Sequence, residues 1–330
     1  MVGLFIFNHQ MIILRYILIF LFLFITLPTY SKESKFEKRL QKDLKKLSKF
    51  NGFIDNNLEL YDEDTISDLK KLIVIIYNHG SYGQAKIDYC NKGAMNVPEI
   101  IRNLHNKKIN DLTIKIYRLC SGVRGLKELD WDKVHNLEKV EGNANGFIEM
   151  SDHEGIQIYD KLQQTNKRKI MLDKVNELIG KGFTNIILAG HSCGAWASLY
   201  LTGRFPDKIK GSIALNPACG DEIDYRKEWP AWGALRNYEE SILLQLSEIN
   251  SLIFIHDKDP FENSETLSFL KKFKDINLID YSKVDPTSCT WPDVDKKMPA
   301  HEGHDIPTSE CFTEYVEKNN YIVNYLESIF

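Results

Sequence analysis

Short apolar runs recur along the chain, and segments with helical spacing separate them. The runs are rich in Ile, Val and Leu and show little polar alternation. Strands of a parallel sheet give this pattern, because helices cover both faces of such a sheet and bury every side chain. We expect six strands, at residues 71–80, 111–120, 185–190, 209–217, 251–259 and 276–282.

Between these runs, apolar residues recur every three or four positions, as on one face of a helix. The segment 169–183 shows this spacing and stops at Gly180 and Gly182. Further helices are expected over 194–205 and 261–273, and from Phe312 to the end of the chain. The alternation predicts an α/β fold, a doubly wound and mostly parallel sheet with helices on both faces. In such sheets ligands bind at the carboxyl ends of the strands.

The first 31 residues have the layout of a secretory signal peptide. Residues 16–27 form an uncharged apolar run, Arg15 precedes it, and small residues ending at Ser31 follow it. We therefore expect an exported protein, periplasmic or extracellular, with cleavage before Lys32. The alternative is a membrane anchor, in which the apolar run is retained in the bilayer.

A basic amphipathic helix is predicted for residues 32–49, which hold eight Lys or Arg against three Asp or Glu. It either caps the domain or contacts an anionic membrane surface. Residues 32–70 lead into the sheet, and the main domain spans 71–330. Two insertions, 121–158 and 220–250, interrupt it at the carboxyl edge. The second holds aromatic residues that either line a pocket or lid, or pack the insertion onto the body: Tyr225, Trp229, Trp232 and Tyr238.

Composition narrows the classes of function. The 330 residues are 43% hydrophobic and 27% charged, as in an ordinary globular protein. A net charge of −4 and the lack of a dense basic tract argue against a nucleic-acid partner. Six cysteines in an exported chain allow disulfides, with fifteen possible pairings. The absence of a C-x-x-C pair argues against a zinc ribbon.

The stretch Gly190-His191-Ser192-Cys193-Gly194 spells G-x-S-x-G between an expected strand and an expected helix. A serine nucleophile on such a turn, a nucleophile elbow, needs an unusual backbone and small flanking residues. The helix N-terminus beside it favours developing negative charge. Ser192 is therefore the candidate nucleophile. We interpret Cys193 as a small elbow residue rather than a second nucleophile.

A serine hydroxyl is a weak nucleophile, so it needs a base, and the base needs an orienting acid. The fifth strand ends in a segment that offers Asp257 and Asp259, and a segment after the sixth offers His301 and His304. The order serine, acid, histidine is thus available for a catalytic triad. The two histidines are three positions apart, one short of the zincin spacing, so we expect no metal.

With these motifs in this order, the chain resembles the α/β-hydrolase superfamily over about residues 71–330. The single-domain esterases and dienelactone-hydrolase-like enzymes are the members it is most similar to. The stretch RFPDKIKGSIALNPA after the elbow adds to this resemblance. The family's acid usually follows in a G-x-x-D-P pattern. The stretch HDKDPF, with His256 for the glycine, implies Asp259 rather than Asp257.

The resemblance also implies the remaining site residues. The family's histidine usually lies in a G-H-D loop, and EGHDIP implies His304 rather than His301. The loop NHGSY resembles the family's H-G motif. It implies an oxyanion hole made by the backbone N–H groups of Cys193 and Ser81, with Tyr82 as the next choice.

We therefore predict an exported serine hydrolase that cleaves a carboxylic ester of a small-molecule or lipid-like acyl substrate through an acyl-enzyme. No cofactor is implied. The alternatives are an acyltransferase or a peptidase with the same triad, or a non-catalytic binding protein on this fold. Cys289 and Cys311 flank the histidine loop. We hypothesise a disulfide there that holds His304 in place.

Overall fold

The computed structural model describes residues 42, 45–80, 96–121, 164–218, 220, 222–228, 230–290 and 303–330. All of them belong to one compact unit, Leu40–Phe330. The expected signal peptide, most of the basic segment 32–49 and nearly all of the insertion 121–158 lie outside the described residues. Within the described parts of the chain, no helix combines the length and the apolar character needed to cross a membrane.

One sheet organises the described residues, and its nine strands lie in the order β2-β1-β5-β3-β6-β7-β8-β9, with β4 paired to β5. Every pair from β5 to β9 is parallel, whereas β1, β2 and β4 pair in antiparallel fashion. This confirms the mostly parallel sheet and all six expected strands. The strands are β1 (Gly52–Ile54), β2 (Leu60–Tyr61), β3 (Leu72–Asn78), β4 (Lys108–Ile109), β5 (Leu112–Leu119), β6 (Asn185–His191), β7 (Gly211–Leu215), β8 (Ser251–Ile255) and β9 (Ile276–Asp280).

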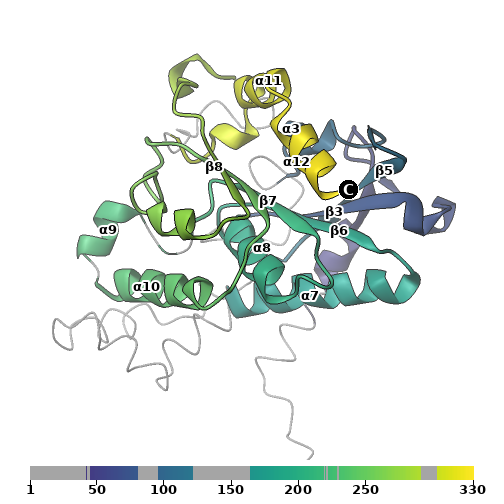
Figure 1. Ribbon diagram of the computed structural model, residues 1–330, viewed down its shortest axis with the longest axis horizontal. Helices are drawn as coiled ribbons and strands as arrows, with labels where there is room; N and C mark the ends of the chain where they lie inside the picture. The colour runs from purple at the N-terminus through teal and green to yellow at the C-terminus, as the bar shows by residue number, and fades with distance from the viewer. Residues whose placement is uncertain are drawn as a thin grey trace, which may run out of the picture. The chain divides into compact units, whose positions relative to one another are not determined.

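Helices cover both faces of the sheet (Figure 1). On one face pack α3, α11 and α12, and on the other α7, α8 and α10. Along β3, Ile73 and Ile75 point to the first face and Val74 and Ile76 to the second, and all four are fully buried. The helices are α3 (Glu99–Arg102), α7 (Gln164–Lys181), α8 (Cys193–Arg204), α9 (Ile223–Glu228), α10 (Pro230–Leu244), α11 (Glu310–Lys318) and α12 (Tyr321–Ile329).

Two predicted helices differ in the structure. The helix expected over 261–273 is wrong: turns lead there into a short 3₁₀ helix, η7 (Ser268–Lys272). The Asn263 side chain accepts from the backbone N–H groups of Glu265 and Thr266, which holds a turn in place of a helix. The closing helix is split into α11 and α12, because Asn320 takes a left-handed conformation with φ 54°.

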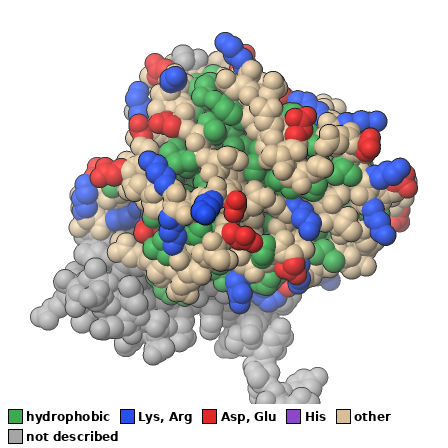
Figure 2. Space-filling view, in the orientation of Figure 1, with side chains coloured by type: hydrophobic (Ala, Val, Ile, Leu, Met, Phe, Trp, Pro, Cys, Tyr) green, Lys and Arg blue, Asp and Glu red, His purple; other side chains and the backbone are tan. Residues whose placement is uncertain are grey.

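Charged side chains of both signs are interspersed over the face of the molecule drawn in Figure 2, without separation into areas of one sign. This distribution is consistent with the small net charge of −4. Among the described residues on this face, Figure 2 shows no basic stripe of the kind that tracks a nucleic-acid backbone.

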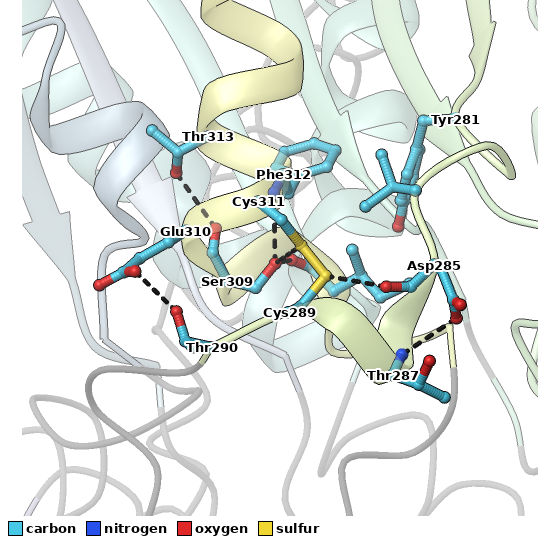
Figure 3. The surroundings of a disulfide bond; sticks show 12 residues. Tyr281, Asp285, Thr287, Cys289, Thr290, Ser309, Glu310, Cys311, Phe312 and Thr313 are labelled. Atoms are coloured by element: carbon cyan, nitrogen blue, oxygen red, sulfur yellow. Dashed lines mark hydrogen bonds between the residues drawn. A yellow bond between two sulfur atoms is a disulfide. The ribbon is translucent and has the colours of Figure 1, made fainter.

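A disulfide joins Cys289 to Cys311, with the Cα atoms 5.4 Å apart (Figure 3). This confirms the pairing hypothesised from the sequence. Beside it, the Thr290 hydroxyl donates to the Glu310 carboxylate at 2.6 Å, and the Glu310 N–H donates to Thr290 O at 3.2 Å. The bond closes a loop that contains His304. Cys120 is also disulfide-bonded, whereas Cys193 is buried and outside any disulfide.

Removing this disulfide should lower the stability of the fold. The bond spans 22 positions. Closing a loop of that length stabilises a fold by about 3 kcal/mol, because it lowers the conformational entropy of the unfolded chain. We expect the variant Cys289→Ser/Cys311→Ser to lose about that free energy of unfolding, as measured by urea denaturation. The variant Cys289→Ala/Cys311→Ala, measured alongside, controls for the added hydroxyls. Equal midpoints for variant and wild type would contradict the prediction.

Candidate active site

Polar residues gather at the carboxyl edge of the sheet. Asn78 ends β3, Ser192 follows β6, Asn216 follows β7, and Asp259 lies just beyond β8. The carboxyl ends of parallel strands meet at one edge, so these residues come from distant parts of the chain to one region. His304 reaches the same region from the loop before α11.

Ser192 sits on a sharp turn between β6 and α8. Its backbone has φ 55° and ψ −126°, a region that residues other than glycine rarely occupy. Such strain persists only where the surroundings fix it, and it clusters at functional sites. The Ser192 N–H donates to Leu215 O at 3.1 Å, which ties the turn to β7. The side chain is half-buried, whereas its neighbours His191 and Cys193 are buried.

The end of β3 packs directly on this turn. A Cβ placed on Gly194 would lie 2.1 Å from Asn78 O and 2.6 Å from His79 O. A Cβ on Gly80 would lie 2.9 Å from the Ser192 Cβ. The candidate oxyanion loop therefore begins beside the serine. The expected donor Ser81 and its alternative Tyr82 lie outside the described residues. Cys193, the other expected donor, is the first residue of α8, where backbone N–H groups point out of the helix.

A buried polar cluster supports the start of that loop. The Ser121 N–H donates to His79 Nε2 at 3.2 Å, so Nδ1 carries the ring proton and donates to Gly80 O at 2.6 Å. Burial and the nearby Lys167 ammonium lower the pKa of His79 to about 3, which keeps the ring neutral. Lys167 Nζ donates to Asn78 Oδ1, His79 O and Ser121 Oγ at 2.9–3.0 Å. Sequence reasoning missed Lys167, because one lysine within a helix gives no signal.

Asp259 and His304 form a buried pair. His304 Nδ1 lies 2.8 Å from Asp259 Oδ2, and the two residues are only 5% and 2% exposed. Asp257, the alternative acid, is exposed, and its carboxylate accepts from the Ser264 hydroxyl. The structure therefore brings Asp259, and not Asp257, to His304. His301, the alternative base, lies outside the described residues.

The surroundings of His304 suit a base. Burial of the ring lowers its pKa, but the charge and hydrogen bond of Asp259, with help from Asp305, outweigh burial and raise the pKa above the ordinary value of 6.5. With Nδ1–H directed to Asp259, Nε2 is left to accept a proton. The imidazolium cannot accept one, so base catalysis requires a pH at or above this pKa.

Several contacts fix the loop that carries His304. Gly303 has φ 90°, and a Cβ there would lie 2.4 Å from the Lys258 carbonyl carbon, so this loop lies against the segment before the acid. Asn216 Nδ2 donates to Gly303 O at 2.7 Å and His304 O at 3.1 Å. The Tyr281 hydroxyl donates to Asn216 Oδ1 at 2.8 Å.

His191 links the elbow to the histidine loop. Burial and the neighbouring His304 lower the pKa of His191 to about 4, so its ring is neutral. Its Nε2 lies 2.8 Å from His304 O and donates to it, and the two rings are 4.8 Å apart. The residue directly before Ser192 thus contacts the candidate base. Sequence reasoning missed this role for His191 and for Asn216, although Asn216 could be found from its position after a strand at this edge.

The described part of the chain contains no group of three or more His, Cys, Asp or Glu placed to hold a metal ion. What the arrangement can do is transfer a proton. A buried acid orients an imidazole, and the imidazole lies 4.8 Å from the ring of His191, the residue before the half-buried Ser192.

The strand order and the strand–elbow–helix turn give the chain the α/β-hydrolase fold, as the resemblance implied. The chain matches no protein-family model and no curated protein. It is similar to a solved structure of the metagenome-derived lipolytic enzymes LipS and LipT (10% identity, 77% of this chain and 94% of that one, TM-score 0.44).

Two further solved structures are similar in the same way. Est1E from Butyrivibrio proteoclasticus with bound ferulic acid has 14% identity over 83% of this chain and 98% of that one, with a TM-score of 0.45. The monoacylglycerol lipase of Paleococcus ferrophilus has 13% identity over 78% and 95%, with a TM-score of 0.43. At such values these likenesses carry no information about the substrate of this chain.

Proposed function

We propose that this chain, an α/β-hydrolase in fold, is a serine hydrolase that cleaves a carboxylic ester through an acyl-enzyme. One observation carries the proposal: the strained Ser192 lies at the same sheet edge as the buried Asp259–His304 pair, whose Oδ2 and Nδ1 atoms are 2.8 Å apart. His191, the residue before Ser192, donates a hydrogen bond to the backbone of His304. A merely structural serine between two glycines requires neither the strain nor the pair.

In the proposed reaction, Ser192 Oγ attacks the acyl carbonyl carbon while His304 Nε2 takes the hydroxyl proton. Asp259 stabilises the imidazolium through Nδ1–H. The tetrahedral intermediate collapses, and the imidazolium gives its proton to the leaving alcohol. Water then attacks the acyl-enzyme with His304 again as base, and this step releases the acid and restores Ser192.

The negative oxygen of each intermediate is proposed to bind the backbone N–H groups of Cys193 and Ser81. The N-terminus of α8 adds the positive end of its dipole at this point. One donor of this kind lowers the barrier by about 3 kcal/mol. The hydrogen bonds of Lys167 and His79 at the start of the loop are consistent with a backbone held ready for this role.

We also propose that the protein is exported and acts on a small-molecule or lipid-like acyl compound. The Cys289–Cys311 disulfide supports export, because such bonds persist in oxidising compartments. Contact of residues 32–49 with an anionic membrane surface is part of the same proposal and rests on their basic composition.

The test is labelling of the purified protein with a fluorophosphonate probe. We expect the wild type to be labelled and Ser192→Ala to lose labelling completely, because the probe reacts only with an activated serine. Ser241→Ala, which removes an exposed hydroxyl on α10, is the control and should label like the wild type.

A product assay with p-nitrophenyl acetate in water and in the presence of an alcohol then separates hydrolysis from acyl transfer. Acetate as the main product supports the esterase, and acetylated alcohol would identify an acyltransferase. A folded wild type that takes no label would overturn the proposal in favour of a binding protein.

A further inference from the structure

Helices α9 and α10, which belong to the insertion 220–250, contact the segment that follows the candidate acid. At the start of α9, the Ile223 N–H donates to Pro260 O at 2.7 Å. Arg226, also on α9, donates to Phe261 O at 2.7 Å and lies 2.8 Å from Glu262 Oε1. The insertion is therefore bonded to the residues next to Asp259 along the chain.

Arg236 on α10 holds the same glutamate from a second helix. Its Nε lies 2.7 Å from Glu262 Oε1, and its Nη2 donates to Thr266 O at 2.9 Å. The guanidinium lies over the rings of Trp196 and Phe269 at 5.1 and 5.3 Å. Glu262 is 1% exposed, so two arginines neutralise a carboxylate that has left water.

The segment held in this way hydrogen-bonds to the carboxylate of the candidate acid. The N–H groups of Phe261 and Glu262 donate to Asp259 Oδ1 at 2.8 and 3.4 Å. The other carboxylate oxygen, Oδ2, contacts His304. The Phe261 ring also lies 4.4 Å from the His304 ring. Any movement of the 261–262 backbone therefore turns the carboxylate relative to the imidazole.

We propose that Arg226 and Arg236 are positioning residues, which aim Asp259 at His304 by clamping Phe261 and Glu262 to the insertion. This inference rests on the proposed function. It gives the insertion a task in the site, because its two helices hold the segment that orients the acid.

Arg226→Gln tests the proposal, because this side chain is 10% exposed and reaches both the Phe261 carbonyl and Glu262. The matched control is Arg168→Gln. The Arg168–Glu239 pair has the same N–O distance of 2.8 Å and the same exposures of 10% and 0%, and it joins α7 to α10 rather than to the acid segment. Both variants lose one buried ion pair, and in Arg226→Gln the Arg236 side chain still neutralises Glu262, so the control should lose at least as much stability as the test variant.

The readout is the rate of fluorophosphonate labelling as a function of pH. We expect Arg226→Gln to label about tenfold more slowly at the plateau, because a misdirected acid orients the base poorly. Its acid limb, the fall in labelling rate at low pH as His304 becomes protonated, should also move to lower pH by about 0.5 units. A nearby carboxylate raises the pKa of a histidine, and a misdirected Asp259 raises it less. The groups that act electrostatically on His304 are unchanged by the substitution: Asp259, Asp305, His191 and Cys193.

For Arg168→Gln we expect the wild-type acid limb and plateau. Arg226→Lys keeps the charge but not the fork of donors, so it should fall between wild type and Arg226→Gln. If Arg226→Gln does not fold, Arg226→Lys against Arg168→Lys carries the same comparison. An acid limb in the Arg226 variants equal to that of the Arg168 variants would overturn the positioning role.

Failure of the proposed function is distinguishable from failure of this inference. The His304 pKa is measured by NMR titration in Ser192→Ala with and without Arg226→Gln, which needs no catalysis. A lower His304 pKa in the double variant supports the positioning role even if the wild type takes no label. An unchanged pKa overturns it.

Discussion

Replacing Asp259 by asparagine should slow fluorophosphonate labelling by about 10⁴-fold while leaving the protein folded. The amide has the shape of the carboxylate, and its oxygen can still accept the Phe261 N–H that Asp259 Oδ1 accepts at 2.8 Å. The amide NH2 then faces His304 Nδ1. Because NH2 only donates, the ring moves its proton to Nε2, and that nitrogen can no longer take a proton from Ser192.

Asp257→Asn is the matched control for this experiment. Asp257 is exposed, and its carboxylate accepts from the Ser264 hydroxyl on the surface. We expect labelling within a factor of about two of the wild type, as for surface substitutions in general. The reverse outcome, a large loss in Asp257→Asn and a small one in Asp259→Asn, would show that the acid was assigned to the wrong residue.

The pH dependence of the Asp259→Asn variant adds a second check. Asp259 raises the pKa of His304, and burial lowers it. With the carboxylate gone, burial dominates and the His304 pKa falls. The acid limb of the residual labelling should therefore lie at lower pH than in the wild type. The plateau rate at higher pH should be much smaller than that of the wild type. A limb that moves to higher pH would mean that Asp259 does not act on the base through its charge.

The sheet was predictable because its central strands are long and buried on both faces. In β3 the side chains from Leu72 to Asn78 are all buried, so the run is apolar almost throughout and easy to recognise. Strands β2 and β4 have two residues each, and no periodicity exists at that length. They form because β1 and β5 offer hydrogen-bonding edges, which only the folded sheet provides.

The elbow was predictable for a different reason: its requirements are local. Strand, small residues, serine and helix stand next to one another in the chain. The Asp259–His304 contact, in contrast, joins residues 45 positions apart. The residues alone offered two acids and two histidines, and only the family pattern favoured one of each. Contacts that exist only in the folded chain bring the pair together, among them the packing of Gly303 against Lys258 and the hydrogen bonds of Asn216 to the His304 loop.

The contacts that hold the site were beyond sequence reasoning. Arg226, Arg236 and Glu262 are ordinary charged residues in a pattern typical of solvent-exposed segments. Their burial follows from how the insertion folds back on the acid segment, and no spacing encodes that. The disulfide is an intermediate case, because two cysteines that flank one loop gave a pairing to expect before the fold was known.

Adding one methyl group at Gly194 should slow labelling strongly, although the residue is neither the acid nor the base. The Cβ of Gly194→Ala would lie 2.1 Å from Asn78 O, 2.6 Å from His79 O and 2.8 Å from the Asn78 carbonyl carbon. All three atoms are backbone, so no side chain can turn aside. Either the end of β3 moves away from α8 or the elbow opens. Both movements separate the candidate oxyanion loop from Ser192.

We expect Gly194→Ala to label at least about 10²-fold more slowly, the cost of losing one oxyanion donor. Stability should fall by about 1–3 kcal/mol, as for other overpacked sites. Gly180→Ala in α7 is the control, because no atom lies within 4 Å of its added Cβ. It should gain about 0.5–1 kcal/mol and label normally. If Gly194→Ala were labelled at the wild-type rate, the close approach of β3 to the elbow would not be what sets the oxyanion hole. The second donor would then have to come from elsewhere than the loop that begins at Gly80.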